Sequence, residues 1–137
     1  MLVPTHVSAL IEVPRGSFVK REAGRGVEYV SPIPCPFNYG CVPELPGADG
    51  DPVDVVLLGA AEKVGARVEA KVWAVVHFLD DGATDDKLVA SVTSPTPEQL
   101  RAVERFFRLY QHPRRWMNRL RGRRGETCFV GVEVLVR

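Results

Sequence analysis

The strongest constraint on the fold comes from residues 66–79, ARVEAKVWAVVHFL, which are rich in β-branched side chains and alternate in part between polar and apolar. Such a run favours one long β-strand over a helix. Shorter segments of similar character are found at residues 6–13, 17–22, 53–59, 87–91 and 127–137. Strands must bury their apolar faces against one another or against a helix. The sequence therefore predicts a small β-barrel with a helix packed on it.

One helix is clearly signalled after these strands. Thr96 is placed to cap its N-terminus, Pro97 suits the first helical position, and Gln99 completes a capping box. Apolar residues then recur at spacings of three and four and form one stripe: Leu100, Val103, Phe107 and Tyr110. We expect this stripe to face the barrel and Pro113 to end the helix.

The overall composition is that of an ordinary globular protein, with 45% apolar and 26% charged residues, and we expect one domain over residues 1–137. No apolar run approaches the roughly 20 residues that span a bilayer, and the first residues lack signal-peptide features, so we expect a cytoplasmic location. Residues 31–52 contain six of the eleven prolines and should form an ordered irregular loop. The three cysteines lack metal-ligand spacing and should be reduced.

Charge is unevenly distributed, although the net charge is only +1. Residues 49–86 carry nine acidic against three basic side chains, whereas residues 87–137 carry eleven basic against four acidic. An acidic cluster beside a basic one is what a site for a metal and an anionic ligand requires. Two solvated faces of a protein without such a site would give the same pattern, so composition leaves both interpretations open.

Three aspartates, Asp49, Asp51 and Asp54, are crowded into the segment GADGDPVDVVLL at residues 47–58. A turn explains the first two, because Asp-Gly and Asp-Pro pairs favour turns. It does not explain Asp54, which shares a strand face with Val56 where the core should begin. A carboxylate there is costly unless it is paired with a cation or ionised against a metal. Ligands that are all oxygen favour hard cations such as Mg²⁺ or Mn²⁺.

A second acidic loop, LDDGATDDKL at residues 79–88, lies between two predicted strands. It carries four aspartates and a lysine: Asp80, Asp81, Asp85, Asp86 and Lys87. Alone, such a loop would be interpreted as solvated. Two acidic loops at strand ends predict instead a site in which shared carboxylates hold closely spaced Mg²⁺ ions, an arrangement that activates water and stabilises a phosphoryl leaving group.

Five motifs occur in the order, and near the spacing, seen in soluble inorganic pyrophosphatases of the Mg²⁺-dependent type: IEVPRGSFVKRE, PFNYG, DGDPVD, DDGATDDKLVA and RFFRLY. The resemblance covers residues 11–116. It implies an α+β fold that is mainly β, an OB-like five-stranded barrel with one main helix. It also implies hydrolysis of pyrophosphate to two orthophosphates with Mg²⁺, or Mn²⁺ in its place, without an organic cofactor or a membrane, in a homo-oligomer.

The resemblance also implies roles for individual residues. Asp51 matches the residue that takes a proton from a metal-bridging water. Six carboxylates match ligands of the metal ions, in part those carried by the substrate: Asp49, Asp54, Asp80, Asp85, Glu22 and Glu12. Four residues match groups that surround the phosphates or the nucleophile: Lys20, Lys87, Tyr39 and Tyr110. The less favoured alternatives are that the two tyrosines are simply core aromatics and that Lys20 is a surface strand residue.

The sequence departs from the family pattern where phosphate should be bound. The family's phosphate-binding arginine aligns with Val27, and Arg25 lies two residues away. A family tyrosine is replaced by Cys35, and a lysine after the helix-end tyrosine by Gln111. Loss of one charge-assisted phosphate contact can cost ~10²-fold in rate. The usual C-terminal helix is also replaced by a predicted strand, so the level of activity stays open.

The arginine-rich segment at residues 112–125, HPRRWMNRLRGRRG, could compensate for this deficit. His112, Arg114 and Arg115 follow Tyr110 closely enough to reach the same site mouth. On an OB-like barrel, the six arginines of residues 114–124 together with Trp116 could instead hold a nucleic-acid backbone and stack bases. We disfavour that interpretation, because the acidic loops would repel a polyanion.

Three functions therefore follow from the sequence. The leading one is Mg²⁺-dependent pyrophosphate hydrolysis. The second is a weakened relative that binds metal or phosphate without turnover, or that hydrolyses a different phosphoanhydride. The third and least favoured is a nucleic-acid-binding module.

Overall fold

The structure is a computed structural model that describes residues 2–17, 19–22, 26–30 and 35–136, without the side chains of residues 19–22 and 26–30. Its elements in chain order are β1 (His6–Val13), β2 (Val19–Glu22), β3 (Gly26–Val30), β4 (Asn38–Pro46), β5 (Pro52–Leu57), β6 (Arg67–Asp80), β7 (Ala83–Thr84), β8 (Lys87–Ser91), α1 (Pro97–Leu120) and β9 (Cys128–Val134). The predicted strands and the predicted helix are all present.

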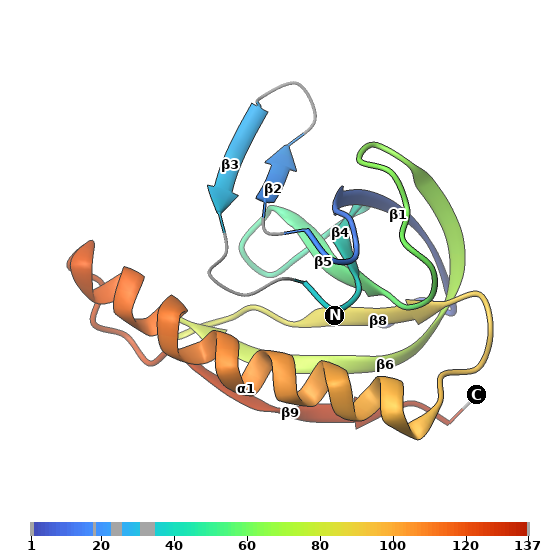
Figure 1. Ribbon diagram of the computed structural model, residues 1–137. Coiled ribbons are helices and arrows are strands. Elements are labelled where there is room, and N and C mark those ends of the chain that lie inside the picture. The colour runs from blue at the N-terminus through green and yellow to red at the C-terminus, as the bar shows by residue number, and fades with distance from the viewer. Residues whose placement is uncertain (1, 18, 23–25, 31–34, 137) are drawn as a thin grey trace.

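Five strands close into a barrel in the order β1-β4-β5-β8-β6, because β6 also pairs with β1. All of these pairings are antiparallel except that of β5 with β8, which is parallel. The long strand β6 pairs with several strands: its first residues pair with β1, its middle with β8, and its second half with β9. β2 and β3 form a separate hairpin that stands away from the barrel in Figure 1. The predicted five-stranded barrel is thus confirmed.

The side chains of β5 alternate between two hydrophobic cores, and this alternation places the site. Val53, Val55 and Leu57 belong to the core that fills the barrel. Val56 belongs to a second core on the outer face of the barrel, where α1 contributes Phe107. Because strand side chains alternate with a period of two, Asp54 lies on the same outer face as Val56. A carboxylate therefore sits at the margin of the layer between barrel and helix.

The helix begins as predicted but does not end at Pro113. Thr96 and Gln99 form the expected capping box, with Thr96 Oγ1 accepting from the Gln99 backbone N–H at 3.1 Å. The helix continues past Pro113 to Leu120. A proline inside a helix removes one intrahelical hydrogen bond and crowds the carbonyl one turn earlier, but here the buried stripe that includes Phe107 extends to Asn118 beyond it. Tertiary packing thus outweighs the local preference, and our prediction of the helix end was wrong.

The irregular loop predicted at residues 31–52 was also wrong in part, because β4 occupies its centre. The unbroken part of the β4–β5 ladder runs from Asn38 to Val42; the register then shifts, and Pro46 pairs with Pro52. The two prolines of β4, Pro43 and Pro46, therefore follow the unbroken part of the ladder, where a missing N–H costs little. At Gly40 a Cβ atom would overlap the backbone carbonyl of Leu10, so glycine permits the close approach of β1 and β4.

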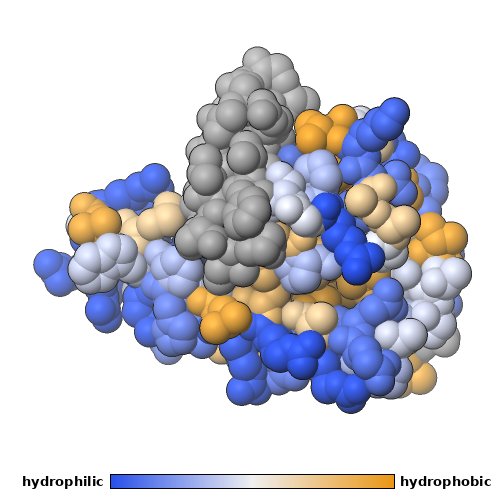
Figure 2. Space-filling view, viewed as in Figure 1, coloured by the Kyte–Doolittle hydropathy of each residue, from blue (hydrophilic) through white to orange (hydrophobic). Residues whose placement is uncertain are grey.

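Hydrophobic residues reach the face seen in Figure 2 as several separate patches between hydrophilic ones. In the part of the chain that the structure describes, no helix has both the length and the apolar character needed to cross a membrane.

Candidate active site

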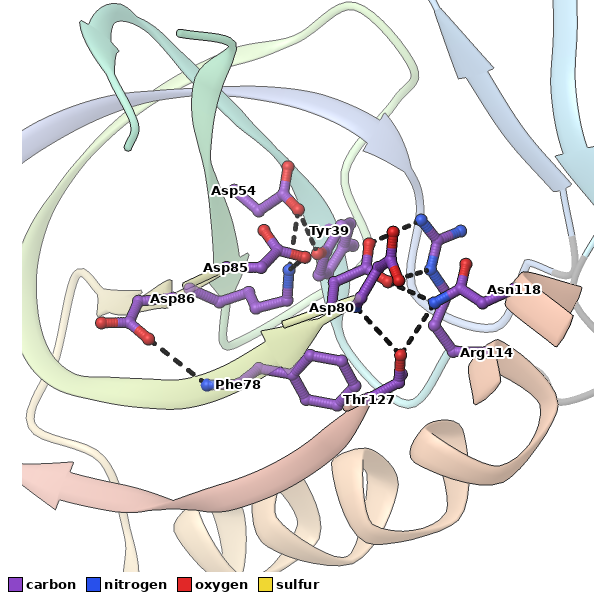
Figure 3. A network of polar contacts seen from close by, with 11 residues as sticks. Tyr39, Asp54, Phe78, Asp80, Asp85, Asp86, Arg114, Asn118 and Thr127 are labelled. Atoms are coloured by element: carbon purple, nitrogen blue, oxygen red, sulfur yellow. Dashed lines mark hydrogen bonds and ion pairs between the residues drawn. The ribbon is translucent and has the colours of Figure 1, made fainter. Parts of the chain in front are cut away.

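Asp54 and Lys87 are brought together by strand register. They are directly opposite one another in the parallel pair β5–β8, and Lys87 Nζ lies 3.0 Å from Asp54 Oδ2. The hydroxyl of Tyr39 on β4 donates to the same oxygen at 2.8 Å. Figure 3 shows the side chains of Asp54 and Tyr39 pointing toward one another. The cost of placing Asp54 next to the core is thus offset by a cation and a hydroxyl from the two neighbouring strands.

Lys87 is the buried cation of this cluster, with 2% of its surface exposed. Its Nζ also contacts Asp85 Oδ2 at 2.9 Å, and it lies 5.7 Å from the centre of the Phe78 ring. Burial alone would lower the pKa of Lys87, but Asp54 and Asp85 outweigh it and raise the pKa above its usual value. The ammonium therefore stays charged and links the two acidic loops.

The surroundings of Asp85 disfavour the ionised form of its carboxyl group. Burial is the main cause that raises its pKa, Lys87 lowers it, and the nearby carboxylates of Asp54 and Asp80 raise it again. The net direction is upward, although Lys87 is in direct contact. A further positive charge at this position would relieve the repulsion among the three carboxylates.

Tyr39 and Tyr110 have one side in the aromatic layer and the other toward the acidic cluster. Tyr39 packs against Phe107, and its pKa is raised by burial and by the charge of Asp54, so its hydroxyl remains a donor. Tyr110 packs on Phe106 and Phe78, with ring centres 5.9 Å and 5.7 Å apart. Both tyrosines are thus core aromatics that also border the acidic cluster.

Asp80 lies at the end of β6 and is held by the second half of α1. Arg114 Nη2 lies 2.7 Å from Asp80 Oδ2, and Arg114 Nε lies 3.3 Å from Oδ1. Asn118 Nδ2 donates to Asp80 Oδ1 at 2.6 Å and to Thr127 Oγ1 at 2.8 Å (Figure 3). Burial raises the pKa of Asp80, but the hydrogen bonds from Arg114 and Asn118 outweigh burial, and the net pKa is below its usual value. This carboxylate is therefore ionised at neutral pH.

Asn118 and Thr127 were missed by the sequence analysis. Asn118 is 1% exposed and lies four residues after Arg114, on the same helix face. The spacing of Phe107, Tyr110, Arg114 and Asn118 continues one stripe, but the expected stop at Pro113 hid it. Thr127 also accepts from the backbone N–H of Asp81 at 3.0 Å, which ties the second acidic loop to the start of β9.

For the other predicted site carboxylates, the structure describes no contact with the cluster of Asp54, Lys87 and Asp85. Asp49 and Asp51 are exposed in the turn before β5, where Asp49 Oδ1 accepts from the Asp51 backbone N–H at 3.0 Å. Glu12 is buried at the point where the β1–β4 register shifts. Among the residues that the structure describes, no three His, Cys, Asp or Glu side chains gather closely enough to hold a metal ion. The ligand roles of these carboxylates stay predictions.

For four residues named in the sequence analysis, the structure describes no side chain. Arg25 lies outside the described residues. Lys20 and Glu22 are on β2 and Val27 is on β3, and their side chains also lie outside the described part.

The remaining departures from the family pattern have structural roles. Cys35 is buried, and burial raises the pKa of its thiol to about 11. Gln111 donates to the Arg108 carbonyl at 2.9 Å and accepts from the Phe129 backbone N–H at 3.1 Å, so it joins α1 to β9. Arg115 Nε donates to the carbonyl of Thr127 at 3.0 Å. His112, Arg114 and Arg115 were expected near the site mouth, and Arg114 contacts the site carboxylate Asp80.

A hard divalent cation fits the donor set at this site. Asp54 and Asp85 present carboxylate oxygens and retain side-chain exposures of 24% and 31%, so both remain accessible. The pKa of Asp85 is raised mainly by burial and further by the carboxylates of Asp54 and Asp80, so a bound cation would favour its ionised form. Mg²⁺ commonly uses one or two carboxylates and completes its shell with water and phosphate oxygens. The absence of a three-carboxylate group among the described residues is therefore compatible with such a cation.

Comparison with known proteins gives the family of the chain. A sequence model of the family "Inorganic pyrophosphatase" matches residues 9–127. Soluble inorganic pyrophosphatase 2 of Chlamydomonas reinhardtii is 36% identical over 128 residues, which cover 79% of this chain and 67% of the relative. The inorganic pyrophosphatase of Saccharolobus solfataricus is 31% identical over 139 residues, covering 83% of this chain and 80% of the relative. The chain spans only 60% of two soluble inorganic pyrophosphatases of rice.

The same barrel is found in solved structures. The crystal structure of inorganic pyrophosphatase from Thermus thermophilus superposes with a TM-score of 0.76 at 22% identity and covers 98% of this chain and 85% of that one. At that identity the match shows a common fold. The family match over most of the sequence and the algal relative show more than the fold: this chain belongs to the inorganic pyrophosphatase family.

Proposed function

We propose that this protein hydrolyses inorganic pyrophosphate to two orthophosphates with the help of Mg²⁺, or of Mn²⁺ in its place. The observation that carries the proposal is the cluster formed by Asp54, Lys87 and Asp85 at the outer margin of the barrel. It combines oxygen donors for a hard cation with a buried ammonium for a phosphate oxygen, in a chain of the pyrophosphatase family.

Each residue of the cluster has a distinct task in this proposal. Asp54 and Asp85 would hold the cation, which when bound lowers the pKa of water and neutralises phosphate charge. Lys87 would contact a phosphate oxygen while staying anchored between the two carboxylates. Asp51, in the exposed turn before β5, would accept the proton of the attacking water. Glu12, Glu22, Asp49 and Asp80 would complete the ligand set, and Lys20 and Tyr110 the phosphate contacts.

A phosphate-release assay with Mg²⁺ and pyrophosphate tests the proposal. We expect turnover by the wild-type protein and its loss, by about 10²-fold or more, in Asp51→Asn, because the variant keeps the shape of the side chain but not its basicity. Glu98→Gln, an exposed substitution in the first turn of α1, is the matched control and should retain wild-type turnover. Wild-type protein that binds Mg²⁺ and phosphate but releases no phosphate would overturn the proposal in favour of binding without turnover.

The altered phosphate surroundings also call for a substrate comparison. Gln111 and Cys35 carry no positive charge, and Gln111 is engaged with β9 while Cys35 is buried. The same assay with tripolyphosphate and a nucleoside diphosphate distinguishes a pyrophosphatase from an enzyme for a larger phosphoanhydride. We expect pyrophosphate to give the highest kcat/KM, and the reverse order would favour the second activity.

We further propose a cytoplasmic homo-oligomer with one domain over residues 1–137. Support for association comes from three exposed apolar side chains of α1: Leu109, Trp116 and Leu120. They recur at helical spacing on the face opposite the buried stripe. Light scattering after gel filtration would test this, with an expected mass above 15.2 kDa. A monomer at micromolar concentration would contradict it.

A further inference from the structure

Two cations of the chain lie among the site carboxylates, and they are held in different ways. Lys87 is 2% exposed and sits between Asp54 and Asp85, so it is fixed from two sides. The Arg114 side chain is 22% exposed and, among the contacts described for it, forms an ion pair with Asp80. A long side chain with one carboxylate partner and access to solvent can change partner without unfolding its helix.

Both oxygens of Asp80 face Arg114, and Oδ1 has a second partner in Asn118. Asp80 Oδ1 accepts from the buried Asn118 at 2.6 Å, and Asn118 is itself tied to Thr127. Asp80 Oδ2 faces Arg114 Nη2 at 2.7 Å. Asn118 can therefore keep the carboxylate in place when Arg114 leaves. If Arg114 left, Oδ2 would be open to another positive charge, while Asn118 would still hold the carboxylate of Asp80.

The guanidinium contact with Asp80 has the form that binds phosphate. Nε and Nη2 of Arg114 address both oxygens of one carboxylate, and the same fork matches two oxygens of a phosphate group. The charge of Asp85 also acts on Arg114, which places its guanidinium within electrostatic reach of the Lys87 cluster. A phosphate held by Lys87 would therefore lie near Arg114 and could serve as its alternative partner.

From these contacts we infer that Arg114 is an exchangeable phosphate ligand: it neutralises Asp80 in the free protein and moves to a phosphate oxygen when a divalent cation takes that carboxylate. The inference rests on the proposed function. No bond is made or broken; Arg114 exchanges one charge-assisted contact for another. Cation and phosphate then enter together as a nearly neutral pair, which explains how a partly buried site admits both.

This exchange predicts effects of opposite sign, which a purely structural tie between α1 and β6 would not give. In Arg114→Gln, Mg²⁺ alone should bind several-fold more tightly, because the competing cation of Asp80 is gone. Inorganic phosphate, titrated in the presence of saturating Mg²⁺, should bind about tenfold more weakly, because a charge-assisted contact is lost. Isothermal titration calorimetry of the full chain measures both dissociation constants without turnover.

Two further variants make the test specific. Arg119→Gln removes another arginine from the exposed last turn of α1 and should leave both dissociation constants unchanged. Arg114→Lys keeps the charge but not the fork, so Mg²⁺ binding should stay near wild type while phosphate binding weakens several-fold. This second variant decides the question if Arg114→Gln fails to fold, which its thermal melting curve would reveal.

The outcomes separate the inference from the proposed function. Wild-type protein that binds Mg²⁺ and hydrolyses pyrophosphate, with phosphate affinity unchanged in both Arg114 variants, would overturn the role of Arg114 alone. Weaker binding of both Mg²⁺ and phosphate in Arg114→Gln would identify Arg114 as a structural tie. Wild-type protein that binds neither Mg²⁺ nor phosphate would overturn the proposed function, and the inference with it.

Discussion

At the scale of single residues, Lys87 determines whether the acidic cluster can exist in a folded protein. Its ammonium lies within 3.0 Å of Asp54 and 2.9 Å of Asp85, and almost none of its surface reaches solvent. Without it, two partly buried carboxylates face one another with no cation between them. Loss of one member of a buried ion pair is far more costly than loss of an exposed one.

We therefore expect Lys87→Met to lower the free energy of unfolding by about 3 kcal/mol at neutral pH. The apolar stem is replaced by a similar volume, so the loss reflects charge rather than a cavity. Urea unfolding followed by circular dichroism measures it. Lys63→Met, which replaces an exposed lysine in the loop before β6, is the control and should change stability by less than about 0.5 kcal/mol.

Millimolar Mg²⁺ should restore part of the stability lost in Lys87→Met, because a cation at the carboxylates replaces the missing ammonium. The restoration should disappear in the double variant Lys87→Met/Asp54→Asn. Equal stabilisation of the single and double variants by Mg²⁺ would show that the cation binds elsewhere.

The residues of the site differ in how visible they are in the sequence. Asp54 could be predicted, because a carboxylate between valines conflicts with burial and demands a partner. Its contact with Lys87 could not, since it depends on the parallel register of β5 and β8, which no local pattern encodes. Asn118 and Thr127 were invisible for another reason: each is an ordinary polar residue until the helix and β9 are brought against Asp80.

At the scale of elements, local signals predicted where strands and helix begin better than where they end. The capping box at Thr96 fixed the start of α1, whereas Pro113 gave a false end because the packing of Phe107 and Asn118 keeps the helix in place. β4 was hidden by its prolines, although they follow the unbroken part of its ladder. Proline and capping rules are local, but the energy that decides element length is tertiary.

Gly40 permits the contact between β1 and β4 that closes the barrel, and we expect Gly40→Ala to be severely destabilising. Its Cβ would overlap the Leu10 carbonyl, a backbone group that cannot rotate away. The strands would have to separate, at a cost we place at about 3 kcal/mol or more. Thermal unfolding tests this, with Gly131→Ala on β9 as control, because the added methyl group there meets no atom within 4 Å. Similar melting temperatures for the two variants would contradict the close approach.

At the scale of the whole molecule, β9 pairs with the second half of β6, and His77 adds a side-chain contact between the two strands. His77 Nε2 lies 2.8 Å from Glu133 on β9, and His77 Nδ1 lies 3.0 Å from Asp86 in the second acidic loop. Both ring nitrogens can donate only in the imidazolium form. The hydrogen bond with Glu133 is the largest cause that raises the pKa of His77; burial opposes it, and Asp86 raises it further.

The raised pKa makes the stability of the protein depend on pH in a definite direction. A group whose pKa is higher in the folded state contributes stability that is complete below its unfolded value, here 6.5, and is lost as the pH rises through the folded value. We therefore expect the urea midpoint of the wild-type protein to fall between about pH 6 and about pH 8.5. The neutral ring would turn a lone pair toward one of the two carboxylates, which weakens the attachment of β9.

The variant His77→Gln isolates this contribution, because glutamine keeps a donor but does not titrate in this range. Its urea midpoint should be lower than that of the wild-type protein at about pH 6 and should change less toward about pH 8.5. Glu133→Gln should give a similar, smaller loss of pH dependence, since Asp86 remains as a partner of His77. If both variants keep the full wild-type pH dependence, the titrating group lies elsewhere, and β9 is held to β6 by its backbone ladder alone.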